Sequence, residues 1–343
     1  MTRFSGPAPA FGTPEMRSEF LLDPSYIATN HGSFGAPPRK VLEERARITL
    51  EIEANPDLFC KVNYHHELNA ALEPILSATG RHPIPSSLRT QKILYFSTVY
   101  GNVLNGINYT SSNDAFSSIQ LQITYPISTK SILPSSNPQS QPNAQTETTL
   151  LKPDFFVTNL HKWLYVPRGA AVFYCARRFH GVIRHPVISE YDPKDWKRGF
   201  HWVGTTDVSP YLTAPFAIEY RKWIGGEDAI IKYCHDLAVS GGRIVAERLG
   251  TSVLRGVLDG EDALSGDDLY ASMVNVAVPD TPLVTEDFMN KLQVYLLQEF
   301  KAGTAPYKHG DKYYLRLSAQ VYLNEQDFVK LADVLYTVFY GKQ

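Results

Sequence analysis

The chain has 343 residues and a formal net charge of −2 at pH 7, from 33 basic and 35 acidic side chains. Hydrophobic residues make up 43% and charged residues 20%, which is typical of a globular protein of two or three domains. This balance argues against a nucleic-acid or membrane binder that acts through bulk charge. Three cysteines without a C-x-x-C pair indicate neither a disulfide framework nor a metal site, and no apolar run approaches the ~20 residues of a membrane span. We therefore expect a soluble, cytoplasmic protein.

The first third of the chain is predicted to hold an arm, two helices and a strand. Residues 1–25 begin with a stretch rich in Pro, Gly and Ala, which predicts a loose N-terminal arm. Apolar residues at helical spacing predict a helix that starts at 37–38, where two prolines stand, and stops at 55–57, where Asn precedes Pro. We expect a second helix over 67–76 and a strand over 92–98, which is rich in aromatic and branched side chains.

The remainder of the chain alternates between strand and helix patterns. Residues 131–149 are an exception, because three prolines, no aromatic residue and almost no charge predict a flexible surface loop. The expected strands are 118–125, 154–159, 169–175, 273–278 and 313–317, and the expected helices are 103–109, 215–249 with a break at Gly225-Gly226, 285–300 and 324–339. This alternation predicts an α/β architecture. After the arm, we expect a large domain over 26–214 and a small C-terminal domain over 215–343.

The strongest local signal is a lysine that follows a strand. Residues 154–169 read Asp-Phe-Phe-Val-Thr-Asn-Leu-His-Lys-Trp-Leu-Tyr-Val-Pro-Arg-Gly, so Lys162 comes just after the strand 154–159. In a parallel sheet this is where the ligand crevice opens. Apolar neighbours would desolvate the Lys162 amine, lower its pKa and leave it available for Schiff-base chemistry. The alternative is a surface lysine that happens to follow a strand.

Several segments resemble one known family. Residues 158–164 (Thr-Asn-Leu-His-Lys-Trp-Leu) resemble the cofactor-lysine motif of the class V aminotransferase group of pyridoxal-phosphate (PLP) enzymes. The other segments that resemble this family, in family order, are 30–35 with 55–59 behind it, 95–101, 202–211 and 315–320. Together they look most like isopenicillin-N-epimerase-like proteins and the fungal hercynylcysteine sulfoxide lyases of ergothioneine biosynthesis. The resemblance implies the PLP-dependent transferase fold type I, with a mixed, mostly parallel sheet in the large domain and a small C-terminal α+β domain.

The resemblance assigns five residues to the cofactor. Lys162 would bind PLP covalently and, once the substrate releases it, act as the base at the substrate Cα. Asn159 and His161 flank it where this group binds the cofactor phosphate, although a satisfied core histidine is the alternative for His161. Thr205 would reach the phosphate from the neighbouring subunit, since such sites form at a homodimer interface. Tyr100 would stack on the pyridine ring and could donate a proton to a leaving group.

Three further residues are assigned to an amino-acid substrate. Arg316 would clamp the substrate carboxylate through its two-pronged guanidinium, a geometry that lysine cannot reproduce. It also alternates with leucines on a strand, so a surface or ion-paired arginine is the alternative. Asn30 and His31 would line the substrate side.

Two parts of the family pattern are absent. Residues 80–91 occupy the place of the small-residue phosphate loop but do not contain a comparable sequence. The run 131–149 stands in place of an Asp-x-Ala-His motif, whose aspartate pairs with the pyridine nitrogen and lets the ring accept electrons. Losing that charge partner would cost on the order of 10²–10⁴ in rate. We infer an internally shortened family member that lacks central strands of the sheet.

The implied reaction is β-elimination across the C–S bond of a cysteine-conjugate sulfoxide. Epimerisation uses the same proton removal at Cα and returns the proton to the other face, so local sequence does not separate the two reactions. Transamination is a third possibility. The alternative from another class is a non-catalytic scaffold that cannot hold PLP, because the phosphate loop and the pyridine aspartate are absent.

Overall fold

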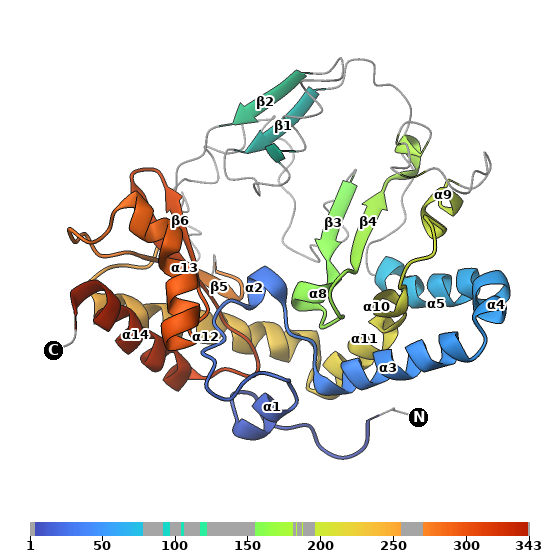
Figure 1. The fold of residues 1–343 in the computed structure, drawn as a ribbon, viewed down its shortest axis with the longest axis horizontal. Helices are drawn as coiled ribbons and strands as arrows, with labels where there is room; N and C mark the ends of the chain where they lie inside the picture. Colours follow the sequence, from blue (N-terminus) through green and yellow to red (C-terminus); the bar gives the residue numbers. More distant parts are fainter. Residues whose placement is uncertain are drawn as a thin grey trace, which may run out of the picture.

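A computed structural model describes residues 4–77, 92–96, 104–105, 117–121, 155–180, 183, 187, 196–254 and 270–341 (Figure 1). Three sequence predictions lie outside these residues: the flexible loop over 131–149, the departure at 80–91 and the cofactor role of Tyr100. The expected helix over 103–109 is described only at residues 104–105, which are helical.

The N-terminal arm packs against the body of the protein, which corrects the prediction that it is loose. The helix α1 (Pro14–Ser18) begins at Thr13, whose Oγ1 accepts a hydrogen bond from the backbone N–H of Met16 at 3.2 Å. Met16 is fully buried, and the ring of Phe4 stacks on Trp223 with 5.3 Å between centroids. Burial of these apolar side chains offsets the entropy lost when the arm is ordered.

Both predicted N-terminal helices are confirmed. α3 (Arg39–Ala54) starts directly after the two prolines and ends where an asparagine precedes the next one. The short α4 (Pro56–Leu58) and a π-helical turn, η1 (Phe59–Asn63), lead into α5 (Tyr64–Ser77), which begins three residues before the expected 67–76.

The described strands of the large domain form two separate pairs. β1 (Lys92–Phe96) pairs in parallel with β2 (Ser117–Leu121). β3 (Phe155–Asn159) pairs antiparallel with β4 (Ala171–Cys175). The short helix α8 (Leu160–Trp163) follows β3 directly. The described strands of this region therefore include both parallel and antiparallel pairing.

A series of helices follows β4. After the 3₁₀ turn η3 (Arg177–Phe179) come the short helices α9 (Arg198–His201) and α10 (Ser209–Leu212). α11 (Ala214–Trp223) and α12 (Gly226–Leu249) are separated at the glycine pair, as predicted. The apolar stripe of α12 is buried along its whole length.

The C-terminal elements form an antiparallel sheet with helices. β5 (Met273–Ala277), α13 (Glu286–Phe300), β7 (Lys312–Ser318) and α14 (Glu325–Tyr340) confirm the four predicted elements. The strand order is β5–β7–β6, and β6 (Ala305–His309) was not predicted because it contains a proline. A proline is tolerated in such an edge strand.

The core joins segments that are far apart in the sequence. A hydrophobic cluster runs from the arm through α11 and α12 to the C-terminal sheet and α14. In Figure 1 the small helix α2 (His31–Phe34) lies between the C-terminal sheet and α8. Among the described helices, none is both long and apolar enough to span a membrane. The division into domains at 26–214 and 215–343 stays a prediction.

Candidate active site

Lys162 lies in the short helix α8, which begins as soon as β3 ends. Its side chain is partly buried. Burial lowers the pKa of the Lys162 amine below its usual range, and the charge of Arg316 lowers it further. The amine therefore holds its proton less tightly than a surface lysine does, as the sequence predicted for a reactive lysine.

Arg316 lies on β7 and faces the loop before α2. Its Nη2 donates hydrogen bonds to Ser33 Oγ at 2.7 Å and to Asn30 Oδ1 at 3.3 Å. Its Nε is buried without a hydrogen-bond partner among the described residues. Burial lowers the pKa of this guanidinium, although it stays charged at neutral pH. A partly buried guanidinium with a spare donor is suited to a carboxylate ligand.

The segment 30–35 approaches the lysine helix very closely. Gly35 has φ of +65° and ψ of 167°, a conformation that is essentially limited to glycine. A Cβ atom on Gly35 would lie 1.7 Å from the carbonyl oxygen of His161. Glycine at this position therefore allows the two backbones to meet.

His31 lies at this contact, with its ring buried. Its Nε2 donates to the carbonyl oxygen of Lys162, so its Nδ1 is the acceptor and takes a hydrogen bond from the Tyr322 hydroxyl at 2.9 Å. Burial lowers the pKa of His31 to about 4. The structure thus places His31 against the backbone of Lys162, and its contact with substrate stays a prediction.

The structure brings together four of the predicted residues, which are Lys162, Arg316, Asn30 and His31. His161 is half-buried, and its Nδ1 lies 3.3 Å from the carbonyl oxygen of Ala170. Asn159 and Thr205 are exposed. Their phosphate roles stay predictions.

Two residues at the site were missed by sequence reasoning. Ser33 hydrogen-bonds both Asn30 Oδ1 and Arg316, and it stands inside the recognised segment 30–35. Arg221 donates from Nη1 to the carbonyl oxygen of Trp163 at 2.6 Å. Arg221 lies on the buried side of α11. A single arginine on an otherwise apolar helix face is the sequence feature that could have identified it.

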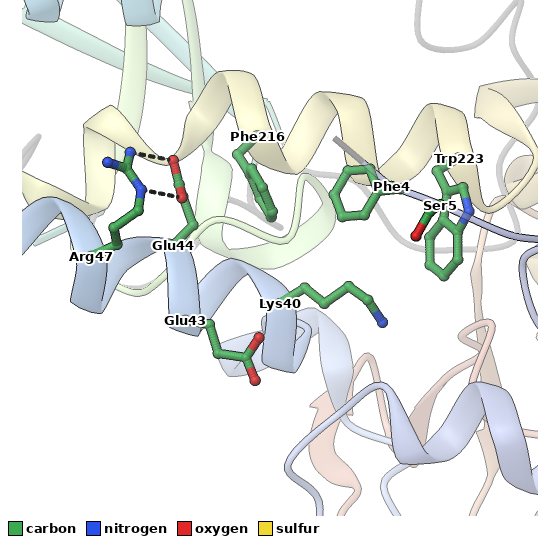
Figure 2. Close-up of a pocket in the computed structure, with 8 residues that line it drawn as sticks. All are labelled: Phe4, Ser5, Lys40, Glu43, Glu44, Arg47, Phe216 and Trp223. Carbon is green, nitrogen blue, oxygen red and sulfur yellow. Dashed lines mark hydrogen bonds and ion pairs between the residues drawn. The ribbon is translucent and has the colours of Figure 1, made fainter. Parts of the chain in front are cut away.

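A separate cavity of about 370 Å³ opens between the arm, α3 and α11 (Figure 2). Figure 2 shows Glu44 and Arg47 joined by paired contacts at its rim, and Lys40 contacts Glu19 at 2.5 Å. The cavity is lined by Phe4, Ser5, Lys40, Glu43, Glu44, Arg47, Phe216 and Trp223. None of the predicted site residues is among them.

The fold is that of PLP-dependent enzymes of fold type I. A mutant of the cystine C–S lyase C-DES, with glycine covalently linked to its PLP cofactor, superposes with a TM-score of 0.68 at 15% identity, over 92% of this chain and 97% of that chain. The apo cysteine desulfurase of Thermococcus onnurineus gives 0.69 at 14% identity, over 98% and 100%. The fold predicted from the sequence is thereby confirmed.

Sequence relatives confirm the resemblance that the motifs indicated. Hercynylcysteine sulfoxide lyase of Schizosaccharomyces pombe is 24% identical over 94% of this chain and 96% of its own length. A probable chloroplastic L-cysteine desulfhydrase of Arabidopsis thaliana is 30% identical over 53% of this chain, and only 39% of its own length is covered. Isopenicillin N epimerase of Streptomyces clavuligerus is 25% identical over 53% of this chain and 46% of its own length. No family model matches the chain.

The alignment with the yeast lyase also bears on the inferred shortening. It spans 397 positions, which is more than the 343 residues of this chain. Part of the relative's length therefore faces gaps in this chain.

Proposed function

We propose that this protein is a PLP-dependent lyase that cleaves the C–S bond of a cysteine-conjugate sulfoxide by β-elimination. The observation that carries the proposal is the desolvated Lys162 amine under the influence of Arg316, whose buried Nε lacks a partner among the described residues. The yeast relative, a sulfoxide lyase aligned over nearly its whole length, supports the choice of reaction.

The described residues fit the lysine and carboxylate ends of such a site. Lys162 offers an amine with a lowered pKa for covalent attachment of PLP, and Arg316 offers a guanidinium with a spare donor for the substrate carboxylate. When bound, PLP supplies the electron sink that stabilises negative charge at Cα.

The chain's own residues supply binding and proton transfer. Arg316, held by Ser33 and Asn30, binds and orients the substrate carboxylate. The freed Lys162 Nζ removes the proton from Cα, which its lowered pKa favours near neutral pH. The C–S bond then breaks, and the sulfur group leaves Cβ with the bonding electron pair. We keep Tyr100 as the predicted proton donor to this leaving group.

The test is reconstitution with PLP. We expect a visible absorbance band in the parent protein and pyruvate with ammonia from an S-substituted cysteine sulfoxide. Lys162→Ala should lose the band and lower the rate of pyruvate formation by ~10²–10⁴-fold. Lys232→Ala, which changes an exposed lysine on α12, is the matched control and should leave both unchanged. A parent protein without a band in excess PLP would contradict the proposal and favour a non-catalytic scaffold.

The epimerase is the second candidate, because isopenicillin N epimerase is among the relatives. Both reactions need Lys162 and Arg316, but only epimerisation inverts Cα while keeping the C–S bond. Chiral analysis of recovered substrate separates them, and a transaminase would instead convert added PLP to its amine form.

We also propose a cytoplasmic homodimer in which Thr205 reaches the cofactor phosphate in the partner's site. Thr205 is exposed, and its loop is anchored by Arg45, which donates to Asp207 Oδ2 at 2.7 Å. The three cysteines are free, which fits a reducing compartment. Thr205→Ala should weaken PLP retention, and a monomer in analytical ultracentrifugation would contradict the shared site.

A further inference from the structure

The turn that follows Lys162 is held in a strained conformation. Tyr165 has φ of +67°, a left-handed value that is rare for a bulky side chain. Its ring is fully buried, and its hydroxyl donates to Gln320 Oε1 at 2.6 Å. Tertiary contacts, and not local preference, therefore determine the path of the chain just after the lysine.

Arg221 is the second element that holds this turn. Its Nη1 donates to the carbonyl oxygen of Trp163 at 2.6 Å, and its Cζ lies 4.9 Å from the centre of the Tyr165 ring. Its Nε and Nη2 contact the two carboxylate oxygens of Glu227 at 2.6 and 2.5 Å. The Arg221 side chain is only 7% exposed, so one buried guanidinium connects α11, α12 and the lysine turn.

The last carbonyl groups of α8 are thus bound by side chains from two distant parts of the chain. His31 takes the carbonyl of Lys162, and Arg221 takes the carbonyl of Trp163. The last carbonyls of a helix lack partners within it, and a four-residue helix has little stability of its own. These two contacts connect the end of α8 to α2 and α11.

We propose that Arg221, together with its partner Glu227, is a positioning residue that fixes the backbone at Trp163 and Tyr165 and thereby orients the Lys162 side chain in the candidate site. It acts through the backbone and does not touch the substrate. The proposal deepens, and rests on, the proposed function of Lys162. Loss of the clamp should let water reach the amine and move it away from Arg316, the charged group that acts on it.

The test measures the titration of Lys162 in the PLP-free protein. Competitive acylation across a pH series, quantified by mass spectrometry, gives the pH midpoint of each lysine, with exposed Lys232 as internal reference. In Arg221→Met the Lys162 midpoint should rise by about half a pH unit, which is a roughly threefold drop in the free-amine fraction below the midpoint. Glu227→Gln should give a smaller rise in the same direction.

The matched control is Arg248→Met. Arg248 also lies on a tyrosine ring, 4.1 Å from the centroid of Tyr336, and contacts Asp333 Oδ1 at 3.0 Å, but none of its described contacts involves the lysine turn. It should leave the Lys162 midpoint unchanged. An equal rise in Arg248→Met, or an unchanged midpoint in folded Arg221→Met, would overturn the proposal. If Arg221→Met does not fold, Arg221→Lys and Glu227→Gln carry the test, and unchanged midpoints in both overturn it.

The two proposals fail separately. A parent protein that binds PLP while Arg221→Met keeps the parent midpoint loses only the positioning role. A parent protein that never binds PLP, with the midpoint still shifted in Arg221→Met, loses the proposed function and keeps the positioning role.

Discussion

The sheet β5–β7–β6 and the strand pair β3–β4 both lead to a residue of the candidate site, but they are packed very differently. Val276 on β5 and Leu315 on β7 are fully buried, and α12 packs against both strands. On β3–β4, by contrast, Val157 is 67% exposed and Phe155 and Phe173 are just over 40% exposed. Arg316 therefore stands on a well-packed strand, whereas Lys162 follows a strand with little burial.

This difference shows how the site is held. A buried strand fixes its own side chains, because each neighbour limits the available rotamers. The lysine helix has no such support from β3, and its backbone is bound by His31 and Arg221 from outside the strand. The precision of the site at Lys162 thus depends on tertiary contacts made by the well-packed part of the molecule.

The largest expected effect is in the packed region. Leu335 on α14 is fully buried, and Leu335→Ala should lower the free energy of unfolding by about 2–5 kcal/mol, through lost burial and the cavity left behind. Urea denaturation measures this loss. Leu297→Ala on α13, where the side chain is 41% exposed, is the matched control and should cost well under half as much. Equal losses would refute the difference in packing.

His31, which contacts both Tyr322 and the backbone of Lys162, should make the stability of the protein depend on pH. His31 titrates at about 4 in the folded protein and at 6.5 when unfolded, so the unfolded state binds more protons between these values. Its contribution to stability is complete above pH 6.5 and falls as the pH drops, by about 2 kcal/mol between pH 7 and 5. Urea titrations of the parent and of His31→Gln at both pH values give this difference. The same acid loss in both proteins would show that His31 is not responsible.

One substitution made in both sheets compares them directly. Val276→Thr buries a hydroxyl on β5 and should cost about 1–3 kcal/mol. Val157→Thr places the same hydroxyl on a strand where the side chain is 67% exposed, and it should change stability by less than about 0.5 kcal/mol. The midpoints of thermal unfolding measure both changes. A large loss at Val157 would mean that β3 is more deeply packed than described.

A further prediction concerns Arg316, which carries a charge within the packed sheet. Its Nε has no partner among the described residues, so Arg316→Met should raise the free energy of unfolding by up to about 1 kcal/mol. The same variant should lose protection by a carboxylate ligand such as acetate, which differential scanning fluorimetry can follow. A destabilised variant that still responds to acetate would exclude the predicted carboxylate clamp.

Hydrophobic periodicity predicted the elements whose stability comes from one buried face. The helices α3, α12, α13 and α14 and the strands β5 and β7 lie where the pattern placed them. The missed elements include α2 and α8, which carry too few residues for a period to be visible, and the edge strand β6, whose proline argues against a strand. The arm was misjudged because its proline and glycine content hides the apolar side chains that anchor it, such as Phe4 and Met16.

The sequence by itself determined the fold, the reactive-lysine candidate Lys162 and the candidate carboxylate-binding residue Arg316, because ordered motifs and apolar spacing are local properties of the chain. Only the tertiary structure decided what supports them. The hydrogen bonds of Tyr165 with Gln320 and of Arg221 with the Trp163 carbonyl join residues that are 155 and 58 positions apart. Such contacts form only when the packed core brings distant segments together, and no spacing along the chain encodes them.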